Sequence, residues 1–95
     1  MNMGSVDRRL KLFYEGRVQG VGFRYRVCTI AKRFPVVGYV RNLPDSRVEL
    51  VVEGNQADLD GFLEAIRQGM GSGIERETQS TESVTSEFTG FSVRM

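Results

Sequence analysis

The sequence predicts a small α+β domain in which two helices cover one face of an antiparallel β-sheet. Apolar residues alternate with polar ones in several short runs, which is typical of strands with one buried face. Two longer segments instead repeat apolar residues every three or four positions, which is typical of amphipathic helices. The chain order is strand, helix, strand, strand, helix, strand, with a short extra strand at the end. This order predicts the split βαβ, ferredoxin-like sandwich.

The first strand and the first helix are predicted from a change of period. Residues 10–15 alternate, and from residue 23 the apolar positions follow helical spacing up to Phe34. Pro35 ends this helix because a proline disfavours helical angles in the residue before it. The sheet face away from the helices is expected to carry the side chains of Lys11, Phe13, Glu15, Tyr39 and Arg41.

A hairpin and a second helix follow. Two β-rich runs, residues 36–42 and 47–53, are joined by a short turn that contains Pro and Asp, which predicts an antiparallel hairpin. Asn55 stands three residues before Asp58, an arrangement typical of a helix N-cap, and Gly69 is a suitable end for that helix. The rest of the chain is expected to form a connector over 70–73, a polar edge strand over 74–82, a loop over 83–90 and a strand over 91–94.

The length of 95 residues predicts one domain. We expect residues 1–9 to form a flexible N-terminal segment and residues 10–95 to form the single domain. There is no 20-residue apolar run and no apolar leader segment, so we expect neither a membrane span nor a signal peptide. The lone Cys28 rules out an internal disulfide and fits a reducing compartment. We therefore expect a cytoplasmic protein, with a monomer as the default.

Charge is unevenly distributed along the chain. Residues 1–47 contain ten Lys or Arg and three Asp or Glu, whereas residues 48–95 contain three Arg and nine Asp or Glu. The basic half suits a small anionic ligand, which local charge would attract. The acidic half would repel the backbone of a long nucleic acid.

Residues 16–24 form a glycine-rich segment that leads directly into an arginine. Gly16, Gly20 and Gly22 let the backbone adopt positive φ and turn its amide N–H groups toward one point. Such amides at the start of a helix favour an anion, and the guanidinium of Arg24 matches the geometry of a phosphate. The segment predicts a phosphate site, with a tight turn and a surface arginine as the alternative.

The absence of histidine from the chain excludes several kinds of chemistry. There is no imidazole base, and one cysteine without histidine provides no zinc cluster of the usual kind, so no metal site is expected. Among the remaining polar groups, Asn42 is the best candidate to hold a water, because its amide can donate or accept a hydrogen bond. The alternative is that Asn42 bonds its own backbone in the turn before Pro44.

Two motifs carry a family resemblance. Residues 16–24, GRVQGVGFR, resemble the first signature of the acylphosphatases, and residues 38–42, GYVRN, resemble the second. The resemblance extends from about residue 10 to residue 94. It implies hydrolysis of the carboxyl–phosphate bond of an acyl phosphate to a carboxylate and inorganic phosphate. By the same resemblance Arg24 binds the phosphoryl oxygens, Asn42 positions the attacking water, and the phosphate is held by the backbone amides of Gln19, Gly20, Val21, Gly22 and Phe23.

This reaction needs no cofactor and no histidine. Phosphoryl transfer depends mainly on positioning and charge stabilisation. The carboxylate leaving group is stable without a proton, and the proton of the water can pass to the phosphate. Two departures from the family pattern are Glu15, a carboxylate just before the loop, and Ser46, which stands where glycine is frequent in the hairpin turn.

Two other functions are compatible with the sequence. One is a non-catalytic module that senses phosphate. The other is a module that binds single-stranded nucleic acid on the exposed aromatic and basic residues of the sheet. Against the second, residues 47–53 lack the aromatic run of RNA-recognition strands and carry Glu49 and Glu53 instead. We therefore expect a small-molecule acyl phosphate as the partner, and neither nucleic acid nor membrane.

Overall fold

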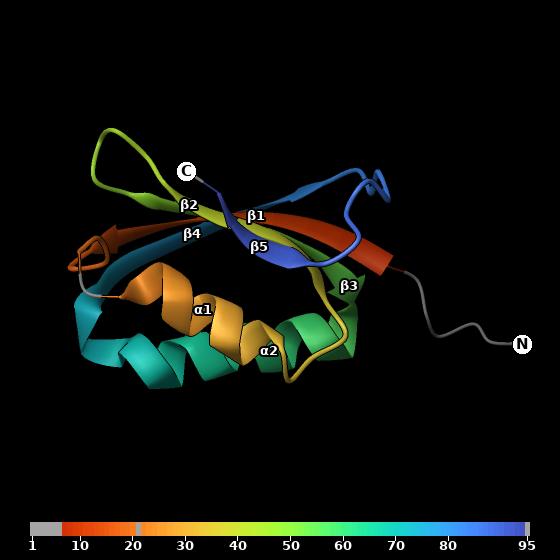
Figure 1. The fold of residues 1–95 in the computed structure, drawn as a ribbon, viewed down its shortest axis with the longest axis horizontal. Helices are drawn as coiled ribbons and strands as arrows, with labels where there is room; N and C mark the ends of the chain where they lie inside the picture. Colours follow the sequence, from red (N-terminus) through yellow and green to blue (C-terminus); the bar gives the residue numbers. More distant parts are fainter. Residues whose placement is uncertain (1–6, 21, 95) are drawn as a thin grey trace, which may run out of the picture.

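A computed structural model describes residues 7–20 and 22–94 (Figure 1). The predicted order of helices and strands is confirmed. Its elements are β1 (Asp7–Gly16), α1 (Phe23–Ala31), β2 (Val37–Asn42), β3 (Val48–Asn55), α2 (Gln56–Met70), a 3₁₀ turn (Gly71–Gly73), β4 (Ile74–Glu82) and β5 (Phe91–Arg94). Neither described helix is long and apolar enough to cross a membrane.

The strands form one sheet in the order β4-β1-β3-β2-β5, and both helices lie on the same face of it (Figure 1). The contacts among β1, β2, β3 and β4 are antiparallel, as predicted. The added strand β5 instead runs parallel to β2, with Gly38 opposite Phe91. The fold is thus the predicted ferredoxin-like sandwich, and the fifth strand makes its sheet mixed.

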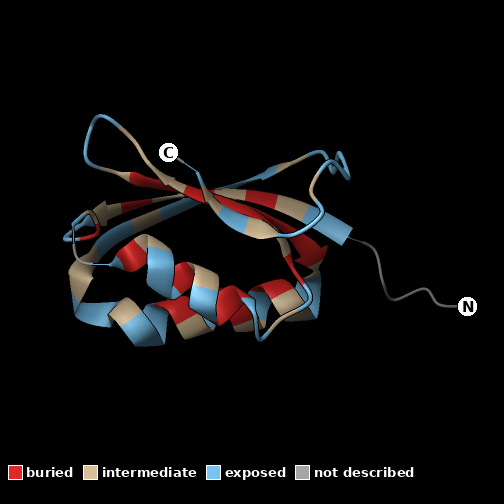
Figure 2. Ribbon diagram, in the orientation of Figure 1, coloured by how far each residue is buried: buried red, intermediate tan, exposed pale blue. Residues whose placement is uncertain are grey.

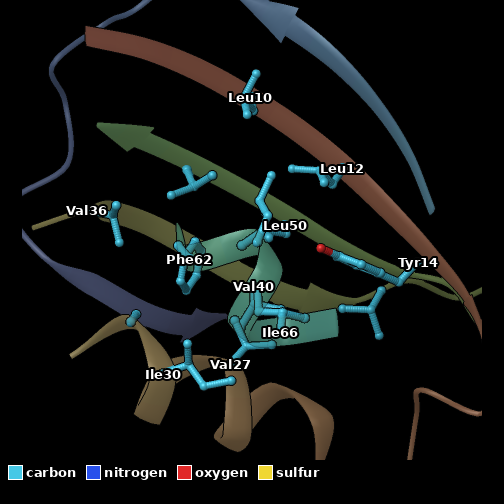
Figure 3. Close-up of a cluster of buried hydrophobic side chains, with 14 of the residues drawn as sticks. Leu10, Leu12, Tyr14, Val27, Ile30, Val36, Val40, Leu50, Phe62 and Ile66 are labelled. Carbon is cyan, nitrogen blue, oxygen red and sulfur yellow. The ribbon is translucent and has the colours of Figure 1, made fainter. Parts of the chain in front are cut away.

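The hydrophobic core lies between the sheet and the helices (Figures 2 and 3). Leu10, Leu12 and Tyr14 of β1 point into it, which confirms the predicted alternation. The apolar stripes of the two helices supply the other side, including Val27 of α1 and Phe62 of α2. Full burial of one such side chain stabilises the fold by roughly 1.5–3 kcal/mol.

Several element boundaries differ from the prediction by a few residues: β2 and β3 begin one residue later than expected, β3 continues to Asn55, and α2 continues past Gly69 to Met70. β1 begins at Asp7, because Asp7 to Arg9 pair with the end of β3, so these residues belong to the sheet rather than to an N-terminal segment. Residues 1–6 lie outside the described part of the chain. α1 ends at Ala31, and the next residues form hydrogen-bonded turns up to Pro35. The predicted N-cap of α2 is confirmed: the amide of Asp58 donates to Asn55 Oδ1 at 2.8 Å.

The face of the sheet opposite the helices is partly covered. The loop over residues 83–90 crosses it, and the backbone amide of Thr85 donates to Glu53 Oε2 at 3.1 Å. Glu49 and Glu53 are each only 4% exposed. Arg41 Nε donates to Glu49 at 2.6 Å, and Lys11 Nζ lies 3.8 Å from the same carboxylate. The basic side chains expected on an open face are therefore engaged in ion pairs.

The aromatic side chains of this face are also occupied. The ring of Tyr39 packs edge-on against Phe88 of the crossing loop, with centroids 5.9 Å apart, and Arg94 lies 3.9 Å above Tyr39. The ring of Phe13 lies beneath the guanidinium of Arg47 at 4.4 Å. A platform of bare aromatic rings for stacking bases is thus not formed by these two residues.

Candidate active site

The loop of residues 16–23 connects β1 to α1 at the same end of the molecule as the β2–β3 turn (Figure 1). Gly16, Gly20 and Gly22 all have positive φ, of 122°, 78° and 78°. Gly22 is the N-cap of α1, and no side chain caps that helix. The three glycines therefore adopt the backbone conformations that the sequence predicted.

The glycines of the loop are required for different reasons. A Cβ at Gly16 would lie 2.5 Å from the carbonyl oxygen of Gly73, so this position has no room for a side chain. A Cβ at Gly20 or Gly22 would meet no atom of the described residues within 4 Å, its chain neighbours aside. At these two positions the left-handed backbone, and not a contact with another described residue, calls for glycine.

Several backbone amides of the loop have no acceptor among the described residues. No described group accepts a hydrogen bond from the amide N–H of Gln19, Gly20, Gly22 or Phe23. The first helical bond of α1 runs from Arg26 N to Gly22 O at 3.0 Å. Unpaired amides and the positive end of the helix dipole favour an anion at this place, and the first turn of α1 contains no acidic residue that would oppose one.

Buried side chains hold both ends of the loop. Val18 and Phe23 are each 1% exposed, and the ring of Phe23 packs against Tyr14 with centroids 5.3 Å apart. Arg24 follows Phe23 in the first turn of α1 and is half-buried. The core thereby fixes the helix start from which Arg24 extends. Val21, another of the five residues predicted to hold the phosphate, lies outside the described residues.

The side chain of Gln19 connects the loop to the β2–β3 turn. Its Nε2 donates to the carbonyl oxygens of Leu43 and Arg47, both at 2.9 Å. Leu43 directly follows Asn42, so these bonds bring the loop next to the end of β2. The sequence indicated only the backbone amide of Gln19, because no local pattern shows which carbonyls its side chain would reach.

Asn42 is the last residue of β2, where it pairs with Val48. Its Oδ1 is buried and has no hydrogen-bond partner among the described residues. The turn-forming bond considered as an alternative is made by another side chain: Asp45 Oδ1 accepts from Arg47 N at 3.1 Å. The amide oxygen of Asn42 is therefore not used to close the turn.

The two departures from the family pattern are also located. Ser46 lies in the hairpin turn with φ of 81°, the left-handed conformation in which glycine is favoured. Glu15 is half-buried and lies opposite Arg76 in the β1–β4 strand register. The register shifts between Glu15 and Gly16. Among the described residues, no group of three or more His, Cys, Asp or Glu is placed to hold a metal ion.

Comparisons with known proteins identify relatives over most of the chain. A family model described as acylphosphatase matches residues 10–93. The chain is 38% identical over 84 residues to the acylphosphatase of Acaryochloris marina, covering 88% of this chain and 90% of that protein. It is 40% identical over 90 residues to the acylphosphatase of Methylococcus capsulatus, covering 90% and 95%.

A solved structure shows the same fold. The crystal structure of acylphosphatase from Bacillus subtilis superposes with a TM-score of 0.82 at 30% sequence identity, over 93% of this chain and 99% of that one. Both sequence and structure thus match over nearly the whole domain, including the glycine loop and the end of β2. The chain belongs to the acylphosphatase family, whose members are hydrolases acting on acyl phosphates.

Proposed function

We propose that this acylphosphatase holds the phosphoryl group of its substrate with the loop amides of residues 19–23 and with the guanidinium of Arg24, and that Asn42 positions the attacking water. The observation that carries this assignment is the set of loop amides without acceptors, which lies between the buried anchors Val18 and Phe23. Donors held in this way need no rearrangement when charge develops on the phosphoryl oxygens.

The proposed reaction transfers the phosphoryl group from the carboxylate to a water molecule. The carbon–oxygen bond of the acyl group is kept, the phosphorus–oxygen bond to the carboxylate breaks, and water supplies the new oxygen on phosphorus. The bonding pair leaves with the carboxylate, and the proton of the water passes to the phosphate. We therefore propose that the reaction proceeds without a metal or an organic cofactor.

The state of Asn42 supports its assignment to the water. A buried amide oxygen without a hydrogen bond costs roughly 1–3 kcal/mol, so a bound water or ligand that donates to it would be stabilised there. A water between Asn42 and the loop would supply that bond. The phosphate itself would be held mainly by the loop and Arg24.

The assignment of Asn42 is tested by separating turnover from phosphate binding. For Asn42→Ala we expect kcat for benzoyl phosphate to fall by about 10²-fold, since one positioned group is lost. We expect inhibition by inorganic phosphate to be largely kept. Asn55→Ala, which removes only the N-cap of α2, is the matched control and should lower stability rather than kcat. Equal losses of turnover and phosphate affinity in Asn42→Ala would contradict the water-positioning role.

The same assay tests whether the reaction is independent of metal. Purified protein is incubated with benzoyl phosphate in excess EDTA, and carboxylate and phosphate are both quantified. We expect unchanged rates and equal yields of the two products. Activity that disappears with EDTA and returns with a divalent cation would contradict the proposed mechanism.

We also propose a cytoplasmic monomer that binds neither nucleic acid nor membrane. The engaged basic residues on the outer sheet face support the absence of nucleic-acid binding, because Lys11 and Arg41 both contact Glu49. A mass of one chain in size-exclusion chromatography with light scattering is the expected result. Retention of a fluorescent single-stranded RNA at low salt would argue for the binding module instead.

A further inference from the structure

We infer that the side chain of Gln19 is a positioning residue: it holds the end of β2, and with it Asn42, at a fixed place relative to the phosphate loop. This inference rests on the proposed roles of the loop and Asn42. It assigns to Gln19 a function different from phosphate binding through its backbone amide, because the side chain acts on the hairpin and not on the substrate.

The geometry uses both hydrogens of the carboxamide. Gln19 Nε2 donates to Leu43 O and to Arg47 O, each at 2.9 Å. These two carbonyls lie on either side of the β2–β3 turn, which is itself closed by Leu43 N donating to Arg47 O at 2.8 Å. The side chain of Gln19 therefore binds a turn that is already closed by its own backbone hydrogen bond.

Few other hydrogen bonds of the described residues hold the loop near Gln19. Arg17 N donates to Gly73 O at 2.8 Å on one side, and the first helical bond of α1 starts from Gly22 on the other. Among the described residues from Gln19 to Gly22, the two bonds of the Gln19 side chain are the only hydrogen bonds that lead to the turn between β2 and β3. Packing of Val18 and Phe23 holds the two ends of the loop, and the Gln19 side chain links its middle directly to the turn beside Asn42.

The contact also requires this kind of side chain. Two carbonyl oxygens need two donors, and the carboxamide provides them on one nitrogen without introducing charge. A glutamate of the same size would turn an oxygen toward both carbonyls and repel them. A methionine keeps the length of the side chain but removes the donors.

The expected consequence is a loss in turnover. If the turn is released, Asn42 and its water move relative to the phosphoryl group, and a displacement near 1 Å costs on the order of 100-fold in rate. Phosphate affinity should change little, because the loop amides and Arg24 are kept. Gln19→Met is therefore expected to lower kcat for benzoyl phosphate by roughly tenfold to a hundredfold, with nearly unchanged inhibition by inorganic phosphate.

A double-mutant cycle with Asn42 provides the decisive test. If Gln19 acts through Asn42, then Gln19→Met should cost much less in the Asn42→Ala background than in the wild type. Additive losses would overturn the inference, as would a wild-type kcat in Gln19→Met. Gln79→Met, at an exposed glutamine of β4, is the matched control and should leave kcat unchanged.

Two further results separate the possible failures. If Asn42→Ala keeps full turnover, the proposed role of Asn42 fails; if it loses turnover but Gln19→Met does not, only the present inference fails. Folding of each variant is checked by circular dichroism. Should Gln19→Met not fold, Gln19→Asn serves instead, since it keeps the amide but shortens its reach by one methylene. A folded Gln19→Asn with wild-type kcat would equally overturn the inference.

Discussion

The hydroxyl of Tyr14 is a buried polar group without a visible role in the site. The side chain is fully buried, and its oxygen has no hydrogen-bond partner among the described residues. Figure 3 shows this oxygen pointing into the apolar cluster. The ring of Tyr14 packs against Phe23, the first residue of the helix that carries Arg24.

Replacing Tyr14 by phenylalanine should therefore stabilise the protein. An unsatisfied buried hydroxyl costs roughly 1–3 kcal/mol, whereas the ring contact with Phe23 is retained. We expect the free energy of unfolding in urea to rise by about 1 kcal/mol, with kcat unchanged. Tyr25→Phe, at a tyrosine that is 73% exposed, is the control and should have no effect. A loss of stability in Tyr14→Phe would show that the hydroxyl does have a partner.

The same hydroxyl should affect stability at alkaline pH. Burial raises the pKa of Tyr14 well above its ordinary value, and the nearby carboxylate of Glu77 acts in the same direction. The unfolded chain then releases the tyrosine proton at a lower pH than the folded protein does. Protonation of Tyr14 therefore leaves the free energy of unfolding unchanged below about pH 10. Above that pH the free energy of unfolding falls by about 1.4 kcal/mol per pH unit. The gap between wild type and Tyr14→Phe should widen above pH 10; a constant gap would contradict this.

At the scale of the elements, Gly38 allows the backbones of β2 and β3 to approach more closely than any side chain would permit. Its φ is 148°, and a Cβ built there would overlap the carbonyl oxygen of Val51 on β3. β2 and β3 would have to separate to admit it. The register that places Asn42 opposite Val48 depends on this close contact.

We expect Gly38→Ala to lower the free energy of unfolding by about 3 kcal/mol or more, since both backbone strain and steric overlap oppose it. Gly71→Ala is the matched control, because its backbone is right-handed helical and a Cβ there would meet no atom of the described residues within 4 Å, its chain neighbours aside. Thermal unfolding of the two variants compares them directly. Equal melting temperatures would show that β2 and β3 adjust without cost.

The loop over residues 83–90 illustrates what the sequence could not predict. Its polar composition correctly indicated a loop, and the bounds of β4 and β5 agree with the predicted 74–82 and 91–94. Its path across the sheet depends on Glu53, more than 30 residues away, and no periodic pattern reports such a contact. The same holds for the parallel direction of β5, which follows from that path.

The predicted site shows a similar division. The positions of the glycines, Arg24 and Asn42 could be inferred because their types and spacing carry the signal. The bonds from Gln19 to the hairpin could not, because they join carbonyls that become neighbours only in the folded chain. The early start of β1 was missed because Asp7 to Arg9 are all polar and show no alternation; their pairing with β3 places them in the sheet.

At the scale of the whole molecule, the two faces of the sheet are stabilised in different ways. One face packs against the helices (Figure 2), while the other is held by the crossing loop and by ion pairs around Glu49 and Glu53. A buried carboxylate is favourable only when donors surround it. Arg9 and Thr85 provide these donors for Glu53.

Glu53→Gln should therefore loosen the crossing loop without affecting catalysis. We expect a loss of roughly 1–3 kcal/mol in stability, because the hydrogen bonds to a charged group are weakened. Amide hydrogen exchange should become faster in residues 83–90, while kcat stays at the wild-type value. Glu64→Gln, at an exposed glutamate paired with Arg67, serves as control and should change stability by less than about 0.5 kcal/mol. Unchanged exchange in the loop would show that Glu53 does not hold it.

In the proposed site, the cation that binds the phosphoryl group comes from a helix start that the core holds in place. Arg24 occupies that position, directly after the buried Phe23. A lysine would keep the positive charge there but not the planar pair of donors that matches two phosphoryl oxygens. The distinction between charge and geometry can therefore be tested at this one residue.

The most direct measurement is kcat/KM for benzoyl phosphate in Arg24→Lys, with Arg33→Lys, beyond the other end of α1, as the control. We expect Arg24→Lys to lose on the order of 10²–10³-fold, while Arg33→Lys stays at the wild-type value. Arg24→Ala should lose all measurable activity and most of its inhibition by inorganic phosphate. Near-normal hydrolysis by a folded Arg24→Lys would contradict the role of Arg24 as the bidentate anchor of the phosphoryl group.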